Sequence, residues 1–86
     1  MPEFLVEVYL SRSDGAEATA VRARAAAEQL TSEGASIRYL SSIFVPEDET
    51  CFVLYRADSA EAVREAARRA SLSFERVSEA VAEPGH

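Results

Sequence analysis

The chain has 86 residues, of which 48% are apolar and 28% charged, and its formal net charge is -6. This length supplies one domain with a single modest core and leaves no room for a second. The acidic balance disfavours nucleic acids and anionic membranes, because both bind through positive patches. No apolar run approaches the ~20 residues that a membrane-spanning helix needs.

One cysteine allows no internal disulfide, and no stretch resembles a secretory signal. We therefore expect a cytoplasmic protein that binds neither nucleic acid nor membrane. The expected organisation is a single domain over residues 1–81 followed by a flexible tail over residues 82–86.

The first predicted element is a strand over residues 3–11, "EFLVEVYLS". Its apolar side chains recur with period two, as in a strand that is buried on one face. One face holds Phe4, Val6, Val8 and Leu10, and the other holds Leu5, Glu7 and Tyr9.

A helix and a hairpin are predicted next. Residues 16–30 are rich in alanine and carry a thin apolar stripe, which is typical of a helix, and Gly34 marks its end. The segments 36–45 and 50–56 are rich in β-branched and aromatic residues and favour strands. The proline and acids of residues 46–49 form a turn between them, so the two strands are predicted to pair as a hairpin.

The second half of the chain repeats the first. A helix is predicted over residues 60–70 and a strand over residues 73–81. Each helix follows an aspartate, Asp14 or Asp58, that stands three residues before a glutamate, so we expect both aspartates to cap their helices. The order β-α-β-β-α-β predicts a ferredoxin-like α+β plait, a four-stranded antiparallel sheet with two helices on one face.

In such a plait the helices leave one face of the sheet uncovered, yet both faces of these strands are apolar. We therefore expect a homodimer through the uncovered face, with Leu5, Glu7, Tyr9 and parts of the hairpin at the contact. In the first hairpin strand, strict alternation groups Ile37, Tyr39, Ile43 and Val45 against Leu40 and Phe44. It does not tell which group faces the helices.

Three segments resemble a known family: the opening "MPEFLVE", the hairpin "YLSSIFVPEDETCFVLYRA" and "DSAEAVREAARRASLSFERVSE". The family consists of small bacterial ferredoxin-like proteins, known as a domain of unknown function, and includes a nickel-binding protein. The resemblance implies the plait fold and a nickel cofactor. The family commonly has Trp-Leu-His-Ser-Tyr in its second strand, whereas this chain has Tyr39 to Ile43 with serine at the histidine position, Ser41.

Several residues are candidates for a site. Nickel favours imidazole and thiolate ligands, and His86 in the expected tail is the only histidine. What the resemblance leaves as metal candidates is Cys51 and Glu7, and it implies Glu7, Tyr39 and Ser41 as candidates for a small ligand. The alternatives are structural: Cys51 as core packing, and Glu7 paired with Arg38 if their strands are neighbours.

Two functions follow from these residues. The first, which we prefer, is a dimeric binding module for a transition metal or small ligand. The second is a dimeric ferredoxin-like α/β-barrel enzyme of the monooxygenase or isomerase type, although no nucleophile-base pair supports it. A purely structural dimerisation module explains every residue without chemistry and remains a third alternative.

Overall fold

The computed structural model describes residues 1–11 and 15–81, and the expected tail over residues 82–86 lies outside them. The predicted order of elements is confirmed. The elements are β1 (Glu3–Tyr9), α1 (Ala16–Ser32), β2 (Ile37–Val45), a short 3₁₀ helix (Pro46–Asp48), β3 (Thr50–Ala57), α2 (Ala60–Arg69) and β4 (Phe74–Ala80). Within the described ranges, no helix combines the length and apolarity that crossing a membrane requires.

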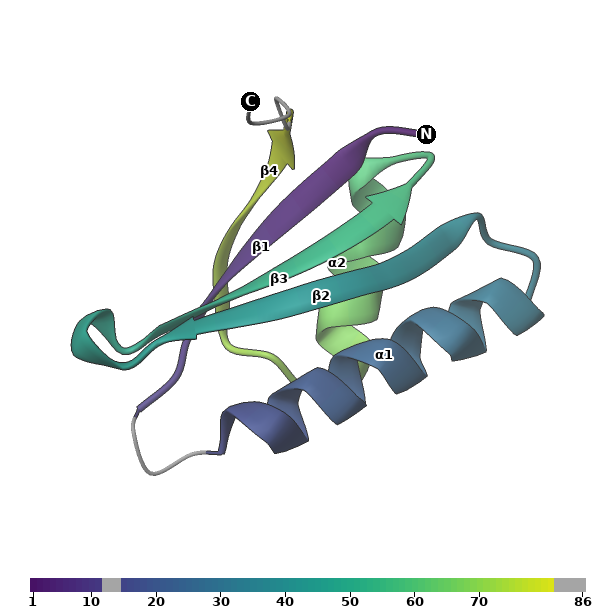
Figure 1. The fold of residues 1–86 in the computed structure, drawn as a ribbon. Coiled ribbons are helices and arrows are strands. Elements are labelled where there is room, and N and C mark those ends of the chain that lie inside the picture. The colour runs from purple at the N-terminus through teal and green to yellow at the C-terminus, as the bar shows by residue number, and fades with distance from the viewer. Residues whose placement is uncertain (12–14, 82–86) are drawn as a thin grey trace.

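The strands form one sheet in the order β2-β3-β1-β4, and every neighbouring pair is antiparallel. Both helices lie on the same side of this sheet (Figure 1). The fold is therefore the predicted ferredoxin-like α+β plait. We call the side of the sheet opposite the helices the open face.

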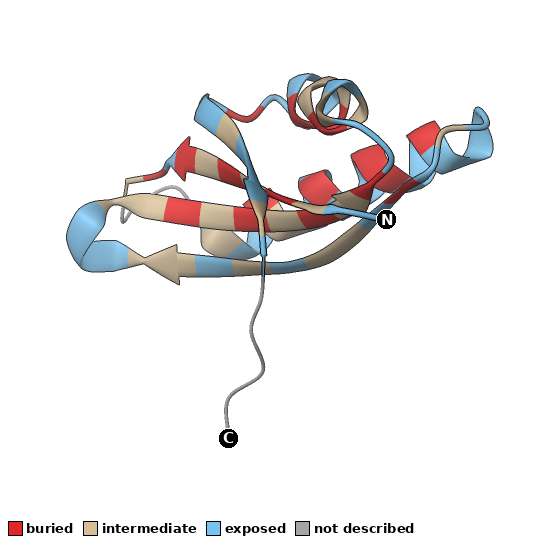
Figure 2. Ribbon diagram, turned by 90° about the horizontal axis from the view of Figure 1, so that it is seen from above, coloured by how far each residue is buried: buried red, intermediate tan, exposed pale blue. Residues whose placement is uncertain are grey.

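The core lies between the sheet and the helices, where buried residues of the strands face those of α1 and α2 (Figure 2). β1 contributes the predicted face, which is buried at Phe4, Val6 and Val8. α1 contributes small side chains to this core, Ala23 among them. Tyr55 connects β3 with α1, since its hydroxyl donates to the carbonyl oxygen of Ala23 at 3.0 Å.

A bulge at Leu40 interrupts the alternation of β2. Tyr39 is opposite Tyr55, but the next pair along the strands is Ser41 with Leu54, so β2 carries one extra residue. The helix-facing side of β2 holds Ile37, Tyr39, Ser42 and Phe44, and its open-face side holds Arg38, Ser41, Ile43 and Val45. The grouping expected from strict alternation is wrong beyond the bulge, because one extra residue moves every later side chain to the other face.

The helix starts differ from the expected caps. The N-cap of α2 is Ser59, whose Oγ accepts a hydrogen bond from the backbone N–H of Ala62 at 3.3 Å. The prediction that Asp58 caps this helix is therefore wrong by one residue. α1 is preceded by Gly15 at φ 72°, a backbone conformation that glycine adopts without strain. The other expected cap, Asp14, lies outside the described residues.

Candidate functional site

Cys51 lies in the core. It is opposite Val8 of β1 and Phe44 of β2, points toward the helices and is 0% exposed. Burial raises the pKa of its thiol, because the thiolate would lose its hydration. Since the thiolate is the form that binds metals and attacks electrophiles, this environment favours the packing role of Cys51.

Glu7 lies on the open face and has a partner on the neighbouring strand. The Nε of Arg76 in β4 donates to Glu7 Oε2 at 2.6 Å. The pair expected with Arg38 does not form, because β3 separates β2 from β1 in the sheet. A pair across adjacent strands explains how a carboxylate is accommodated in an apolar strand.

Cys51 and Glu7 are not brought together. In the pairing of β1 with β3, Glu7 is opposite Phe52, whereas Cys51 is opposite Val8. The two side chains therefore point to opposite faces of the sheet. The sheet itself stands between the thiol and the carboxylate, so the two cannot ligate one ion in this arrangement.

The candidates for a small ligand are also separated. Tyr39 faces the helices, where its ring packs edge-on against Tyr55 with 6.1 Å between centroids. Its hydroxyl hydrogen-bonds with the Ser42 hydroxyl. Ser41 is exposed on the open face next to Leu54, in a different row of the sheet from Glu7.

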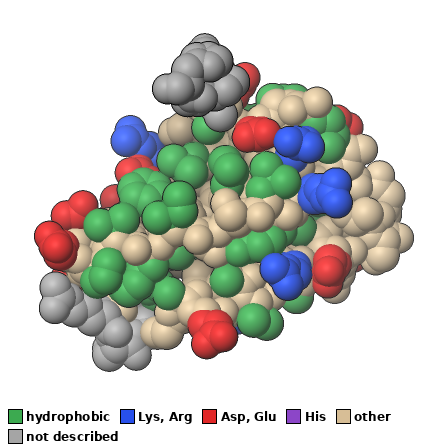
Figure 3. Space-filling view, in the orientation of Figure 1, with side chains coloured by type: hydrophobic (Ala, Val, Ile, Leu, Met, Phe, Trp, Pro, Cys, Tyr) green, Lys and Arg blue, Asp and Glu red, His purple; other side chains and the backbone are tan. Residues whose placement is uncertain are grey.

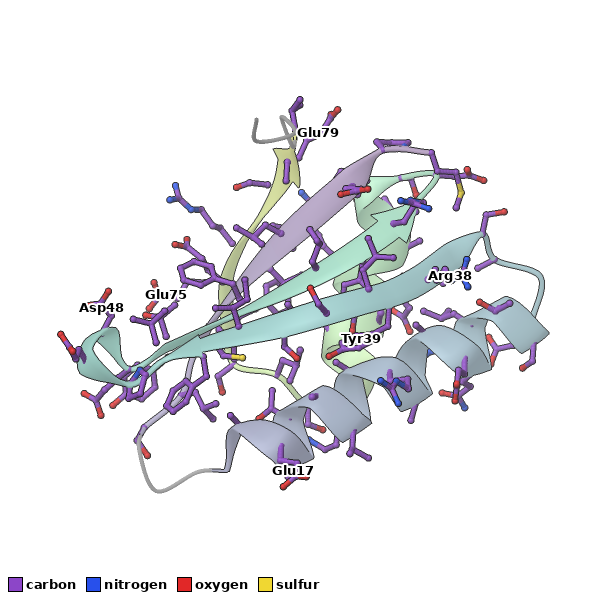
Figure 4. All side chains as sticks on the ribbon, viewed as in Figure 1. Glu17, Arg38, Tyr39, Asp48, Glu75 and Glu79 are labelled. Carbon is purple, nitrogen blue, oxygen red and sulfur yellow. The ribbon has the colours of Figure 1, made fainter. Side chains whose placement is uncertain are left out.

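Glu7 does line an acidic pocket of about 270 Å³, together with Asp48, Thr50 and Glu75. Figure 4 shows Asp48 and Glu75 at the end of the sheet where the β2–β3 turn lies. In the part of the chain that the structure describes, no three or more His, Cys, Asp or Glu side chains gather closely enough to hold a metal ion. The pocket therefore collects negative charge without forming a metal centre.

A second and larger groove, of about 540 Å³, lies between α1 and the edge strand β2. We call it the α1–β2 groove. It is lined from α1 by Arg24, Ala27, Glu28, Thr31 and Ser32, and from β2 by Ile37, Arg38 and Tyr39. Arg24 lies over the ring of Tyr39, with its guanidinium carbon 5.3 Å from the ring centroid. Of these residues, the sequence had indicated only Tyr39 as a ligand contact, because nothing in the linear pattern distinguishes Arg24 from a solvated helix arginine.

The open face carries a patch of hydrophobic side chains. Leu5 and Leu54 are neighbours on β1 and β3, and Phe52 is next to Ile43 of β2. Ile43 is 60% exposed, and Tyr9 at the end of β1 is 53% exposed. Figure 3 shows hydrophobic side chains gathered over the strands on this side of the molecule. The helices do not cover this surface.

Comparison with known proteins agrees with this architecture. A crystal structure of SCO4226 from Streptomyces coelicolor A3(2) superposes with a TM-score of 0.72 over 95% of this chain and 99% of that chain. The two sequences are 19% identical, so this match concerns the fold. A search of curated proteins found no match.

The sequence also matches a family model described as "Nickel responsive protein SCO4226-like" over residues 4–80. The matched stretch runs from the second residue of β1 to the last residue of β4 and so includes α1, β2, β3 and α2. Because the match extends over nearly the whole chain, the protein belongs to the family of SCO4226-like nickel responsive proteins.

Proposed function

We propose that the protein is a homodimeric binding module, assembled by stacking the open faces of two copies. The observation that carries this proposal is the apolar patch on the open face, centred on Leu5, Phe52 and Leu54, with Ile43 largely exposed beside them. A sheet whose two faces are both apolar is stable in water only with a layer on each side. Both helices already cover the other side.

The charges of this face favour a second copy over a charged partner. Glu3 pairs with Arg56 at 2.9 Å, and Glu7 pairs with Arg76, so these four groups neutralise one another within the protomer. Arg38 has no ion pair within the described part of the chain, but it lies opposite Arg56 near the start of β2, at the end of the face and away from its centre. What the centre of the face offers a partner is therefore apolar surface. A second copy presents the same surface, and a two-fold axis lets the patch cover itself.

The nickel in the family description does not fit the donors that one protomer offers. Nickel favours imidazole and thiolate, and the described residues include no histidine and one thiol, which is buried. The oxygen donors of the acidic pocket do not form a metal-binding group, and Glu7 is held by Arg76. These observations favour a small ligand over a nickel ion chelated within one protomer.

The dimer is tested by sedimentation of the protein at micromolar concentration, where we expect twice the chain mass. Ile43→Glu should weaken self-association by at least about 30-fold, because a charge buried in an apolar interface costs about 2 kcal/mol or more. The matched control is Val21→Glu, since Val21 is 65% exposed on α1 and lies away from the open face. A monomeric wild type, or dissociation by Val21→Glu alone, would refute the proposal.

The ligand class is tested separately by elemental analysis of untagged protein after growth with added nickel. We expect nickel well below one ion per chain. Stoichiometric nickel that survives gel filtration would show that the ligand is the metal, and would require donors from a second copy or from residues outside the described ranges.

A further inference from the structure

Two arginines differ from the others in the described part of the chain. Five arginines form ion pairs with glutamates: Arg56, Arg64, Arg68, Arg69 and Arg76. Arg22 donates from its Nε to the carbonyl oxygen of Ala70 at 3.0 Å. Among residues 1–11 and 15–81, Arg24 and Arg38 have neither an ion pair nor a hydrogen bond from the side chain. Both line the α1–β2 groove, Arg24 from α1 and Arg38 from the outer edge of β2, although the row of β2 that holds Arg38 faces the open side.

The presence of two unpaired arginines in one groove is informative because the chain is acidic. With 15 acids for nine basic residues, carboxylates are abundant on the surface, and a guanidinium that finds none is available to a ligand. One carboxylate, that of Glu28, also lines the groove, so the groove carries more positive than negative charge. Figure 4 shows Arg38 and Tyr39 along the edge of β2 that lies beside α1.

The remainder of the groove suits a flat apolar body. Ala27 and Ile37 are buried at its base, and the ring of Tyr39 forms part of its wall beneath Arg24. The hydroxyl of Thr31 is occupied as a donor, because it donates to the carbonyl oxygen of Ile37 at 2.8 Å. The volume of about 540 Å³ is in the range of small-molecule sites, which combine apolar walls with a few polar groups.

We propose that the α1–β2 groove binds a small organic anion, an aromatic or alicyclic carboxylate. Its carboxylate pairs with the guanidinium of Arg24 and with that of Arg38, which reaches the groove around the outer edge of β2. Its ring packs on Ala27, Ile37 and Tyr39. Guanidinium groups hydrogen-bond carboxylates in a bidentate, charge-assisted manner, which gives the site its preference for an anion. This inference rests on the ligand-binding part of the proposed function and names the ligand class. It does not depend on the dimer, since the groove lies at the outer edge of β2.

The test is a titration with 2-naphthoate, followed by amide chemical shifts in ¹⁵N-labelled protein, with 2-naphthamide as the neutral ligand of the same shape. We expect saturable shifts in the last half of α1 and at the start of β2, and about tenfold weaker binding of the amide. Arg24→Gln and Arg38→Gln should each weaken naphthoate about tenfold, because each removes one charge-assisted contact. Arg64→Gln, in which the lost charge lies on α2 and is paired with Glu61, should leave the affinity unchanged.

Several outcomes would overturn the proposal: no saturable shifts, equal affinity for acid and amide, or an unchanged affinity in both groove variants. Shifts confined to the open face would do so as well. Ile43→Glu should retain the affinity for naphthoate while losing the dimer. Naphthoate binding in the groove of a protein that sediments as a monomer would refute the dimer and leave this inference standing.

Discussion

The thiol of Cys51 gives the sharpest test of how the core is packed. Because its side chain is 0% exposed, a thiol reagent can reach it only after the structure opens. Small domains unfold with a free energy of about 5 kcal/mol or more, and each 1.36 kcal/mol is a factor of ten. If only global unfolding exposes the thiol, labelling of the native protein is slower than that of the unfolded chain by about 5,000-fold. The raised pKa of the native thiol acts in the same direction.

The assay follows the release of the coloured thiolate from an aromatic disulfide reagent at pH 8, with and without urea. A matched control is Glu17→Cys in a Cys51→Ala background, because Glu17 is exposed on the first turn of α1 and its replacement should react at once. Native labelling of Cys51 within about tenfold of the unfolded rate would show that the β3 core opens locally and that the packing argument fails. A nickel-dependent thiolate absorption in the native protein would refute it independently, by making Cys51 a ligand.

Three further predictions concern stability, each measured by urea denaturation at a fixed protein concentration. Ser59→Ala should lower the free energy of unfolding by about 0.5–1 kcal/mol, because it removes the acceptor of the Ala62 N–H. Asp58→Ala should change it by less than about 0.3 kcal/mol. A larger loss in Asp58→Ala than in Ser59→Ala would show that the aspartate is the cap after all. Tyr55→Phe should cost about 1 kcal/mol through loss of the buried hydroxyl bond to α1, and a change near zero would show that this bond adds nothing net. Burial raises the pKa of the Cys51 thiol in the folded state. The neutral thiol therefore contributes fully to stability below the unfolded thiol pKa of about 8.5, and this contribution is lost as the pH rises from there through the pKa of the folded state. Stability should therefore fall between pH 8.5 and 10 less steeply in Cys51→Ala than in the wild type, and parallel slopes would contradict the buried neutral thiol.

The sequence by itself determined the order of the elements and the inward face of β1. The reason is that these features are local and restrict the backbone without reference to distant residues. They are the period-two apolar residues of β1, the alanine-rich helix that ends near Gly34, and the proline turn between two β-branched segments. The repetition of this pattern in the second half then leaves few topologies other than the plait. It also predicted an uncovered apolar face, because two helices can cover only one side.

Only the tertiary structure decided which side chains meet. The bulge at Leu40 reversed the facing of Ile43 relative to strict alternation, because β2 carries one residue more than β3 at this point. Strand order gave Glu7 its partner in Arg76, 69 positions along the chain. The way in which the sheet packs on the helices placed the thiol of Cys51 on the helix side. The α1–β2 groove likewise exists only because a helix lies against an edge strand. Such contacts depend on how elements that are distant in the sequence pack against one another, and the spacing of residues along the chain does not specify that packing.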